Sequence, residues 1–484
     1  MAAEVKHHEL YGPLCAIVGP KYVADSDFAN YAYSADLDLY SSKMPGIIVR
    51  PGTTEEVADI VKLANRTHTP IVPRAGGASL LGWKTGEAGR NIIVDVTRMD
   101  KVLDIDVGNM LLTVEAGTLC SKIETIVEEK TGGEITAHTV WMPAYSATIG
   151  GVVSGVTGGG LPSPEFVAQG LARDNIIGLK IVMPTGEVLQ TGLGPGVNVC
   201  AKKTFSQWVP TGDFTPMFLG DGGSYGIKTE VTLKLHRVPK VNRSGSALFD
   251  SFEDAWNAEY ALTRIEPLPY GNLWGVAPPM LKLQLGIEMK EHCLIYSVRG
   301  NTEEEVDLKE KAIREAFAKN GGKPGTAATD AMAKGLMESP VGIRELGATY
   351  AVGLLGATDQ VFPLHGFMDL YRESRKFLDE WEPRCQELNI PGLDHFEPCG
   401  PNIMYYAVDK VYHGDNPESK EVAREITDQT AEWAWRAGGA VLYFGDMSAE
   451  IAGKFFSPAY YSFMKTLKTA LDPNNIMNPG LWGI

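Results

Sequence analysis

The sequence predicts an α+β protein built from two consecutive halves, and three observations support this fold class. Short β-rich runs alternate with helical runs from about residue 46 to residue 240. From 241 to 430 the helical runs are longer, with strands between them. Four glycine-rich segments interrupt these elements. We therefore expect a ligand-binding half at 46–240, a covering half at 241–430, an N-terminal segment at 1–45 and a C-terminal segment at 431–484 that completes the ligand site.

The composition is that of a globular protein and argues against several classes of function. The chain has 484 residues, enough for two or three packed units, with 44% hydrophobic and 21% charged residues. Its formal net charge of -16 argues against nucleic acid and anionic membrane surfaces as partners, because both recruit clusters of Lys and Arg. No run approaches the roughly 20 apolar residues that span a bilayer, so no membrane-spanning segment is expected.

The cysteines and the first residues indicate a compartment. The six cysteines are scattered and form no CxxC pair, which indicates neither a zinc or iron–sulfur site nor a disulfide framework. Residues 1–12 lack the apolar core and the cleavage site of a signal peptide. We therefore expect a soluble protein in the reducing cytoplasm.

The elements of the first half follow from hydrophobic periodicity and turn residues. Residues 53–68 predict a helix capped by Thr54, because the apolar positions from Val57 to Ala64 share one face. Residues 121–133 predict an amphipathic helix closed by glycine, and 176–192 a strand–turn–strand hairpin. The remaining runs predict strands at 46–52, 69–77, 91–99, 110–117 and 226–239.

The second half and the tail are dominated by helices. The clearest helices are predicted at 251–265, 301–320 and 418–439, with a strand at 293–300. Residues 320–330 are rich in glycine and small polar residues and predict a mobile loop. The tail closes with the segment 467–484.

The first glycine-rich segment ends a predicted strand, where small residues let backbone N–H groups converge on an anion. It is not the GxGxxG pattern of a Rossmann fold, and taken alone it is also compatible with a simple turn. The segment consists of Pro73, Arg74, Ala75, Gly76, Gly77, Ala78, Ser79 and Leu80.

The other three segments strengthen this interpretation through their order and spacing. The second, at 143–160, has so many positions without a side chain that a flat or extended ligand is expected against its backbone. A flexible surface loop is the alternative, but interleaved apolar residues such as Ile149 and Val152 argue against it. The third and fourth segments lie at 218–227 and 471–480.

Together these segments resemble the FAD-binding domain shared by vanillyl-alcohol oxidase and p-cresol methylhydroxylase. The closest resemblance is to the D-type subunit of glycolate oxidase and to the D-lactate dehydrogenases, and it extends from about 46 to 481. It implies a two-subdomain FAD-binding domain, an α/β cap over the flavin and a C-terminal segment that returns to it. By this resemblance the FAD-binding residues are Pro73, Arg74, Ala75, Gly76, Gly77, Ala78, Ser79, Leu80, Pro143, Ser146, Ala147, Thr148, Gly150, Gly151, Ser154, Ile176, Asp221, Ile227 and Asn478.

The resemblance also bears on how the flavin is held. Relatives that attach FAD covalently in the first loop have a histidine directly after the two glycines, where this chain has Ala78. Other relatives attach the flavin from the cap, which leaves His395, His413 or a tyrosine open for that role. We expect non-covalent FAD.

In the cap, 342–345 and 359–364 resemble segments of the 2-hydroxyacid dehydrogenases. The resemblance implies that Arg344 binds the substrate carboxylate, a role for which the planar guanidinium is suited. The alternative is a surface ion pair of Arg344 with Glu345 or another neighbour.

The metal-binding motifs of those dehydrogenases are not preserved. Their H-x-GDGN-x-H and EHGIG motifs correspond here to 394–406 and 438–446, where only His395 remains as a candidate base. We expect no metal. Tyrosines replace the lost histidines, as in the phenol-oxidising relatives, and Tyr405 and Tyr443 are candidate catalytic residues. Tyr405 and Tyr406 alternate on a strand, so at most one of them faces the flavin.

His413 is the last catalytic candidate, although its sequence context favours a loop residue. The sequence as a whole predicts an FAD-dependent oxidoreductase that removes hydride from a small organic substrate. A 2-hydroxy acid held by Arg344 is the leading substrate, and a 4-alkylphenol or aromatic alcohol activated by tyrosines is the alternative. A flavin-bearing electron-transfer subunit that has lost its substrate site is a third hypothesis. An electron-transfer protein or a quinone is expected as acceptor, and a homodimer as the assembly.

Overall fold

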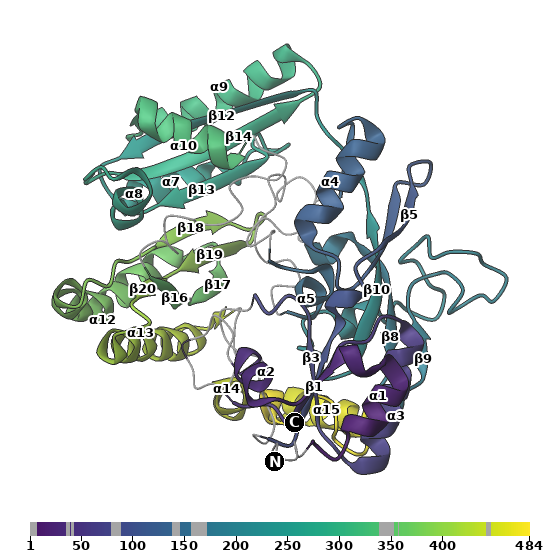
Figure 1. Ribbon diagram of the computed structural model, residues 1–484. Helices are drawn as coiled ribbons and strands as arrows, with labels where there is room; N and C mark the ends of the chain where they lie inside the picture. The colour runs from purple at the N-terminus through teal and green to yellow at the C-terminus, as the bar shows by residue number, and fades with distance from the viewer. Residues whose placement is uncertain are drawn as a thin grey trace.

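A computed structural model shows a protein of two main parts with a pair of C-terminal helices below them (Figure 1). The structure describes residues 7–34, 39, 43–78, 89–137, 146–155, 172–337, 353–356, 358–441 and 447–484. Helices and sheets are mixed throughout, as the predicted α+β class requires. Within the described residues, no helix is long and apolar enough to cross a membrane.

The first sheet has four strands in the order β1-β2-β4-β3, and its three longest strands are parallel. A parallel pair needs a crossover, and α3 provides it between β2 and β3. The strands are buried on a core shared with α1 and α3. The elements are α1 (Tyr11–Val18), β1 (Val23–Ala24), α2 (Asp27–Ala32), β2 (Ile47–Val49), α3 (Thr54–Thr67), β3 (Ile71–Arg74) and β4 (Ile92–Asp95).

The predicted cap of α3 was wrong by one residue. Thr53 caps the helix, because its Oγ1 accepts from the N–H of Glu56 at 3.1 Å. Thr54 is buried inside the first turn, where its hydroxyl donates to the hydroxyl of Thr229 at 3.0 Å. Either threonine is a good cap by type, and a tertiary contact takes up the second one.

The second sheet is antiparallel, in the order β5-β6-β10-β8-β9. The predicted hairpin at 176–192 is confirmed as β8 and β9, and the predicted helix at 121–133 as α4, which ends at Gly132 in the left-handed region. The elements are β5 (Val102–Asp106), β6 (Leu111–Glu115), α4 (Cys120–Thr131), α5 (Ile149–Ser154), β8 (Ile176–Val182), β9 (Val188–Gln190) and β10 (Ile227–Lys234).

The cap has an eight-stranded sheet in the order β15-β12-β14-β13-β18-β19-β17-β21. Helices α7, α9, α12 and α13 share a core with one face of it, and α8 and α10 pack on part of the other face. The strands are β12 (Val241–Phe249), β13 (Asn272–Val276), β14 (His292–Gly300), β15 (Lys323–Pro324), β17 (Asp359–Pro363), β18 (His395–Pro398), β19 (Ile403–Ala407) and β21 (Ala440–Val441). The helices are α7 (Phe252–Leu262), α8 (Pro278–Leu285), α9 (Glu303–Lys319), α10 (Ala327–Met337), α12 (Phe367–Glu387) and α13 (Pro417–Arg436).

The predicted mobile loop at 320–330 is wrong, since it contains β15 and the start of α10. β15 pairs with β12, and the backbone N–H of Gly325 donates to the carbonyl of Ser246 at 3.1 Å. The hydroxyl of Ser246 also donates to that of Thr329 at 2.8 Å. These contacts come from a strand about 80 residues earlier in the chain, so the local composition gave no indication of them.

The C-terminal part returns to the first sheet. After α14 (Ser448–Phe455) and α15 (Pro458–Leu471), the chain runs beside β3 as an isolated parallel bridge. The N–H of Ile71 donates to the carbonyl of Ile476 at 2.6 Å, and the N–H of Asn478 donates to the carbonyl of Ile71 at 2.7 Å. Figure 1 shows these yellow helices below the purple and blue strands of the N-terminal part.

Candidate functional site

The first two glycine-rich segments are in direct contact. The loop after β3 lies against the segment that begins α5, and the N–H of Gly76 donates to the hydroxyl of Thr148 at 3.2 Å. A Cβ atom added to Gly76 would lie 2.1 Å from the carbonyl oxygen of Ser146. Only glycine therefore allows the two backbones to approach this closely.

The third segment joins the same cluster. The N–H groups of Gly220 and Gly222 donate to the carbonyls of Val153 and Ser154, at 2.9 and 2.8 Å. Through these bonds the turn that precedes β10 is attached to the C-terminal end of α5.

The carboxylate of Asp221 organises this turn from within. It accepts from the N–H groups of Gly223 at 2.9 Å and Tyr225 at 3.3 Å, and it forms a buried ion pair with Lys228. Burial lowers the pKa of Lys228, which the adjacent carboxylate opposes. Gly223, at φ 75°, lies against the ring of Pro73 at the end of β3.

The fourth segment holds the third in place. The side-chain amide of Asn478 donates to the carbonyl of Gly222 at 2.7 Å. The buried ammonium group of Lys468 donates to the carbonyl of Ser224 at 3.1 Å and pairs with Asp472 at 2.8 Å. All four segments thus meet at the end of β3, although they are spread over some 400 residues of sequence.

The loop after β3 has the features of an anion site. Within the described part of the chain, the backbone N–H groups of Gly77 and Ala78 have no acceptor. Gly77 has φ 65°, which a side chain rarely permits. The guanidinium of Arg74 lies against Gly77 and over the ring of Tyr33, 5.0 Å from its centre. Successive free N–H groups beside a cation favour a phosphate.

Tyr33 is a residue of this region that sequence analysis missed. Its hydroxyl donates to Asp95 at 2.5 Å, and burial raises its pKa to about 12. It comes from the N-terminal segment, which contains no motif, and its position beside Arg74 is a long-range contact.

The predicted FAD contacts are placed as follows. Residues of the first two segments and Asn478 lie in the cluster, while the side chain of Asp221 is turned toward its own loop. Ile227 begins β10 beside the cluster, whereas Ile176 pairs with Leu233 at the other end of that strand, about 20 Å away by the rise of a strand. Only an extended ligand would reach both. Ser79, Leu80 and Pro143 lie outside the described residues.

On the cap, β18 and β19 place two catalytic candidates on one face. His395 and Tyr405 lie on these neighbouring antiparallel strands, with ring centres 5.6 Å apart, and Trp274 lies 5.3 Å from His395. The helices α7 and α12 cover the opposite face. In Figure 1 the strands β17, β18 and β19 end on the side of the cap toward α5.

His395 is held as a neutral ring. A carbonyl only accepts, so the 3.0 Å contact between Nδ1 and the carbonyl of Leu393 places a proton on Nδ1. Burial lowers the pKa of His395 to about 4. At neutral pH its Nε2 therefore has a lone pair that can accept a hydrogen bond or a proton.

Tyr406 lies on the opposite face from Tyr405, packed against Phe252, Phe367 and Tyr371. This arrangement confirms the predicted alternation along β19. His413 lies in the turn after β20 (Lys410–Tyr412), where its Nε2 contacts the carbonyl of Asn389 at 3.1 Å. The structure does not bring it to His395. Arg344 and Tyr443 lie outside the described residues.

Glu397 is a second residue that sequence analysis missed. It lies two residues after His395 on β18, directly opposite Tyr405. Its side chain is buried, and burial, together with Asp359, raises its pKa well above the usual range. The alternation of a strand was enough to place Glu397 on the face of His395, but only the burial marks it as unusual.

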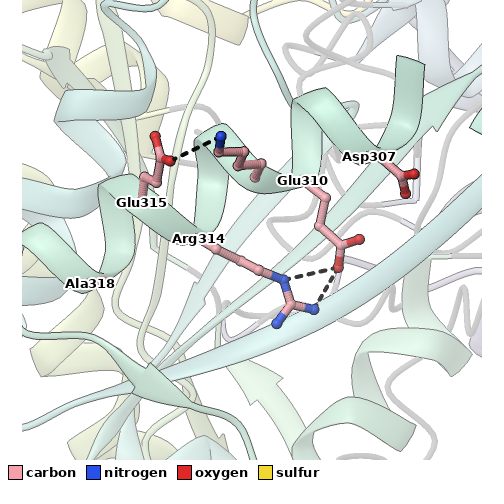
Figure 2. Close-up of a pocket in the computed structure, with 6 residues that line it drawn as sticks. Asp307, Glu310, Arg314, Glu315 and Ala318 are labelled. Atoms are coloured by element: carbon pink, nitrogen blue, oxygen red, sulfur yellow. Dashed lines mark hydrogen bonds and ion pairs between the residues drawn. The ribbon is translucent and has the colours of Figure 1, made fainter. Parts of the chain in front are cut away.

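Two other kinds of site find no support in the described part of the chain. Among the described residues, no group of three His, Cys, Asp or Glu side chains has an arrangement that could hold a metal ion. Figure 2 shows an open depression along α9, where Arg314 bonds to Glu310 at 2.6 Å and Lys311 pairs with Glu315 at 3.9 Å. These are neighbours on one turn of a surface helix and leave no group directed at a ligand.

Comparison with known families agrees with this geometry. Residues 45–192 match the family described as "FAD binding domain", and residues 238–481 match the family described as "FAD linked oxidases, C-terminal domain". The second match covers half of the chain.

Curated relatives and solved structures cover nearly the same length. The glycolate oxidase protein GlcD of Bacillus subtilis is 24% identical over 96% of this chain and 95% of its own. The mitochondrial D-lactate dehydrogenase [cytochrome] of Arabidopsis thaliana is 26% identical over 90% of this chain and 73% of its own. The fold is that of p-cresol methylhydroxylase, with a TM-score of 0.81 and 19% identity over 98% and 96% of the two chains. A 4-ethylphenol oxidase from Gulosibacter chungangensis has a TM-score of 0.82 and 16% identity over the same shares.

Proposed function

Because the chain belongs to the FAD-linked oxidases, we propose that it oxidises a small 2-hydroxy acid by transfer of hydride from C2 of the substrate to non-covalently bound FAD. The enzyme is thus an FAD-dependent oxidoreductase. The observation that supports the substrate class is the neutral, buried His395 on the face of the cap sheet opposite α7 and α12, with its Nδ1 proton donated to Leu393. Two of the relatives are named for the oxidation of glycolate and of D-lactate, both 2-hydroxy acids.

The glycine cluster fits an FAD molecule, which needs an anion site for its pyrophosphate and a surface without side chains for its rings. The free N–H groups of Gly77 and Ala78 and the guanidinium of Arg74 would hold the pyrophosphate. Gly151 is exposed on α5, and a Cβ added to it would lie 3.6 Å from that of Ala75. The backbone of α5 would therefore lie flat against the ligand.

FAD supplies the hydride acceptor when it is bound. The chain itself handles the proton and the carboxylate. His395 Nε2 takes the proton of the C2 hydroxyl, because the other ring nitrogen is fixed on Leu393. Tyr405, on the adjacent strand, lines the same face and contacts the rest of the substrate. We assign Arg344 to the substrate carboxylate, which its planar fork matches bidentately.

A phenolic substrate is the second candidate. The face that holds His395 also has Tyr405 and Trp274, so its walls are aromatic. In this alternative Tyr405 holds a phenolate, and hydride leaves the benzylic carbon.

Anaerobic bleaching of the flavin in the purified holoenzyme separates the two. We expect 2-hydroxy acids to bleach the flavin in the presence of a chelator, and 4-alkylphenols to leave it oxidised. The Arg344→Ala variant should lose about 100-fold or more in kcat/KM for hydroxy acids, since a charged hydrogen-bonded pair to the carboxylate is removed. Bleaching by alkylphenols alone, with Arg344→Ala unimpaired, would show that the assignment of Arg344 and of the substrate is wrong.

The proposal also includes the domain boundaries, the electron acceptor, the cellular location and the assembly. We assign 46–240 to the FAD-binding domain, 241–430 to the cap and 431–484 to the segment that completes the site. An electron-transfer protein or a quinone is proposed as the acceptor, the cytoplasm as the location and a homodimer as the assembly. Light scattering of the purified protein tests the last of these.

A further inference from the structure

The face of the cap sheet that holds His395 has a regular grid of side chains. Gly275 on β13 is paired with Phe396 on β18, and the two strands are antiparallel. Trp274 therefore lies opposite Glu397. Glu397 is in turn the partner of Tyr405 on β19. Glu397 therefore lies in a row between two aromatic residues, and His395 belongs to the next row on the same face.

This row is buried, yet its carboxyl group has no partner. Trp274, Glu397 and Tyr405 have 1%, 2% and 0% of their surface exposed. Within the described residues, no hydrogen bond or ion pair involves the carboxyl group of Glu397. A buried polar group without a partner is costly to the fold, and such groups gather where a ligand provides the missing partner.

Further unpaired polar atoms continue the face beyond Glu397. Asn272 lies two residues before Trp274 and is the partner of Ser297 on β14. The side-chain N–H₂ of Asn272 and the hydroxyl of Ser297 are both buried and have no hydrogen-bond partner among the described residues. Unsatisfied groups thus occupy the row of Glu397 and the next row on the side away from His395.

The spacing of the grid sets the size of the ligand. His395 and Glu397 are two residues apart on one strand, a separation of about 7 Å. This span accommodates one benzene ring with a substituent opposite its point of attachment. The aromatic side chains of Trp274 and Tyr405 on either side of Glu397 suit a flat ring.

The acidic side chains near Glu397 determine which substituent of the ring is accepted there. The neighbouring acids are Asp359 on the same face and Glu259 on α7, both buried, and the latter has no partner for either oxygen in the described structure. Within the described part of the chain, no cation lies beside Glu397 and Glu259 to balance the charge of a carboxylate at the far end of a substrate. A neutral hydroxyl would instead give Glu397 its missing hydrogen bond.

We propose that Glu397, Trp274 and Tyr405 receive the far end of the substrate, and that the preferred substrate is a 2-hydroxy acid with an aromatic ring whose para position bears a hydroxyl group. The inference rests on the proposed function, since His395 is taken to act at the C2 hydroxyl. Glu397 is then a specificity-determining residue that contacts the ring hydroxyl.

The test compares kcat/KM of the holoenzyme for lactate, 2-hydroxyglutarate, mandelate and 4-hydroxymandelate. We expect 4-hydroxymandelate to be preferred over mandelate by about tenfold, the effect of one hydrogen bond to a buried group. We expect 2-hydroxyglutarate to be the poorest of the four. A higher kcat/KM for 2-hydroxyglutarate or lactate than for both aromatic acids would overturn the inference while leaving the proposed function intact. If none of the four reduces the flavin, the proposed function itself fails.

Variants of Glu397 test its role through a ratio, which loss of folded protein does not change. In Glu397→Leu the ratio of kcat/KM for 4-hydroxymandelate to that for mandelate should fall to about one. Glu397→Gln keeps a neutral hydrogen-bonding group and should retain most of the preference. Glu304→Gln, at an exposed position in the first turn of α9, is the control and should keep the ratio of the wild type. An unchanged ratio in Glu397→Leu would show that Glu397 does not contact the ring hydroxyl.

Discussion

At the scale of single residues, the enzyme buries the carboxyl group of Glu259 in uncharged form. Glu259 is 0% exposed, and both of its oxygens are without a partner among the described residues. Burial, and then the nearby Glu397, raises the pKa of Glu259 well above its usual range. A carboxyl whose pKa is raised on folding contributes stability below its unfolded pKa, near 4.3, and this contribution is lost as the pH rises.

The Glu259→Gln variant should therefore become more stable than the wild type as the pH increases. We expect its free energy of unfolding to exceed that of the wild type by about 2 kcal/mol at pH 8, and to differ little at pH 4.5, because the side chain is neutral in both proteins there. Urea denaturation at the two pH values measures the difference. Glu304→Gln, at an exposed position in the first turn of α9, is the control. An equal effect of Glu259→Gln at both pH values would contradict the explanation.

At the scale of elements, the C-terminal segment holds the glycine-rich segment 218–227 in place. Asn478 bonds to Gly222 through its side chain and to Ile71 through its backbone. Its φ of 45° lies in the left-handed region, which asparagine tolerates better than most residues. Lys468 secures the same turn from α15 through the carbonyl of Ser224.

The Asn478→Ala variant should weaken the contact between the C-terminal segment and Gly222. The variant loses one buried hydrogen bond and adopts a strained backbone, so we expect about 1–3 kcal/mol less stability and roughly tenfold weaker FAD binding. Fluorescence of the released flavin on dilution measures the affinity. The control is Asn474→Ala, in the same loop, whose exposed side chain bonds to Asn65 at 2.9 Å. Equal flavin release from the two variants would show that Asn478 has no special role.

The same elements show what the sequence could reveal. Helices with capping residues and a clear apolar stripe, such as α3 and α9, were predicted within a few residues, and the four glycine segments were recognised as one site. The order of the cap strands, the 21-residue α12 and the location of β15 were not, because they depend on partners far away in the chain. Glu397 and Tyr33 were missed for the same reason, since their environment is built by other strands.

At the scale of the whole molecule, FAD would link distant parts of the chain. Its proposed contacts run from Pro73 to Asn478, and the cap lies over the same side (Figure 1). A ligand that binds only the folded state stabilises it by mass action.

Removal of FAD should therefore lower the Tm of the whole protein. Adding FAD at 100 times its Kd should raise the free energy of unfolding by about 2.7 kcal/mol. Calorimetry of apoprotein with increasing FAD measures this, and riboflavin, which lacks the pyrophosphate, is the control for the loop at Gly77. A Tm that responds equally to riboflavin would contradict the assignment of that loop to the pyrophosphate.

The bridge between β3 and residues 476–478 also bears on how the protein is made. β3 is complete at residue 74, but its neighbour at residues 476–478 leaves the ribosome about 400 residues later. At the 5–20 residues per second of protein synthesis, the edge of β3 waits tens of seconds for that partner. The loop at Gly76 stays incomplete during this interval, so the nascent chain is expected to acquire its flavin only after residues 476–478 have emerged.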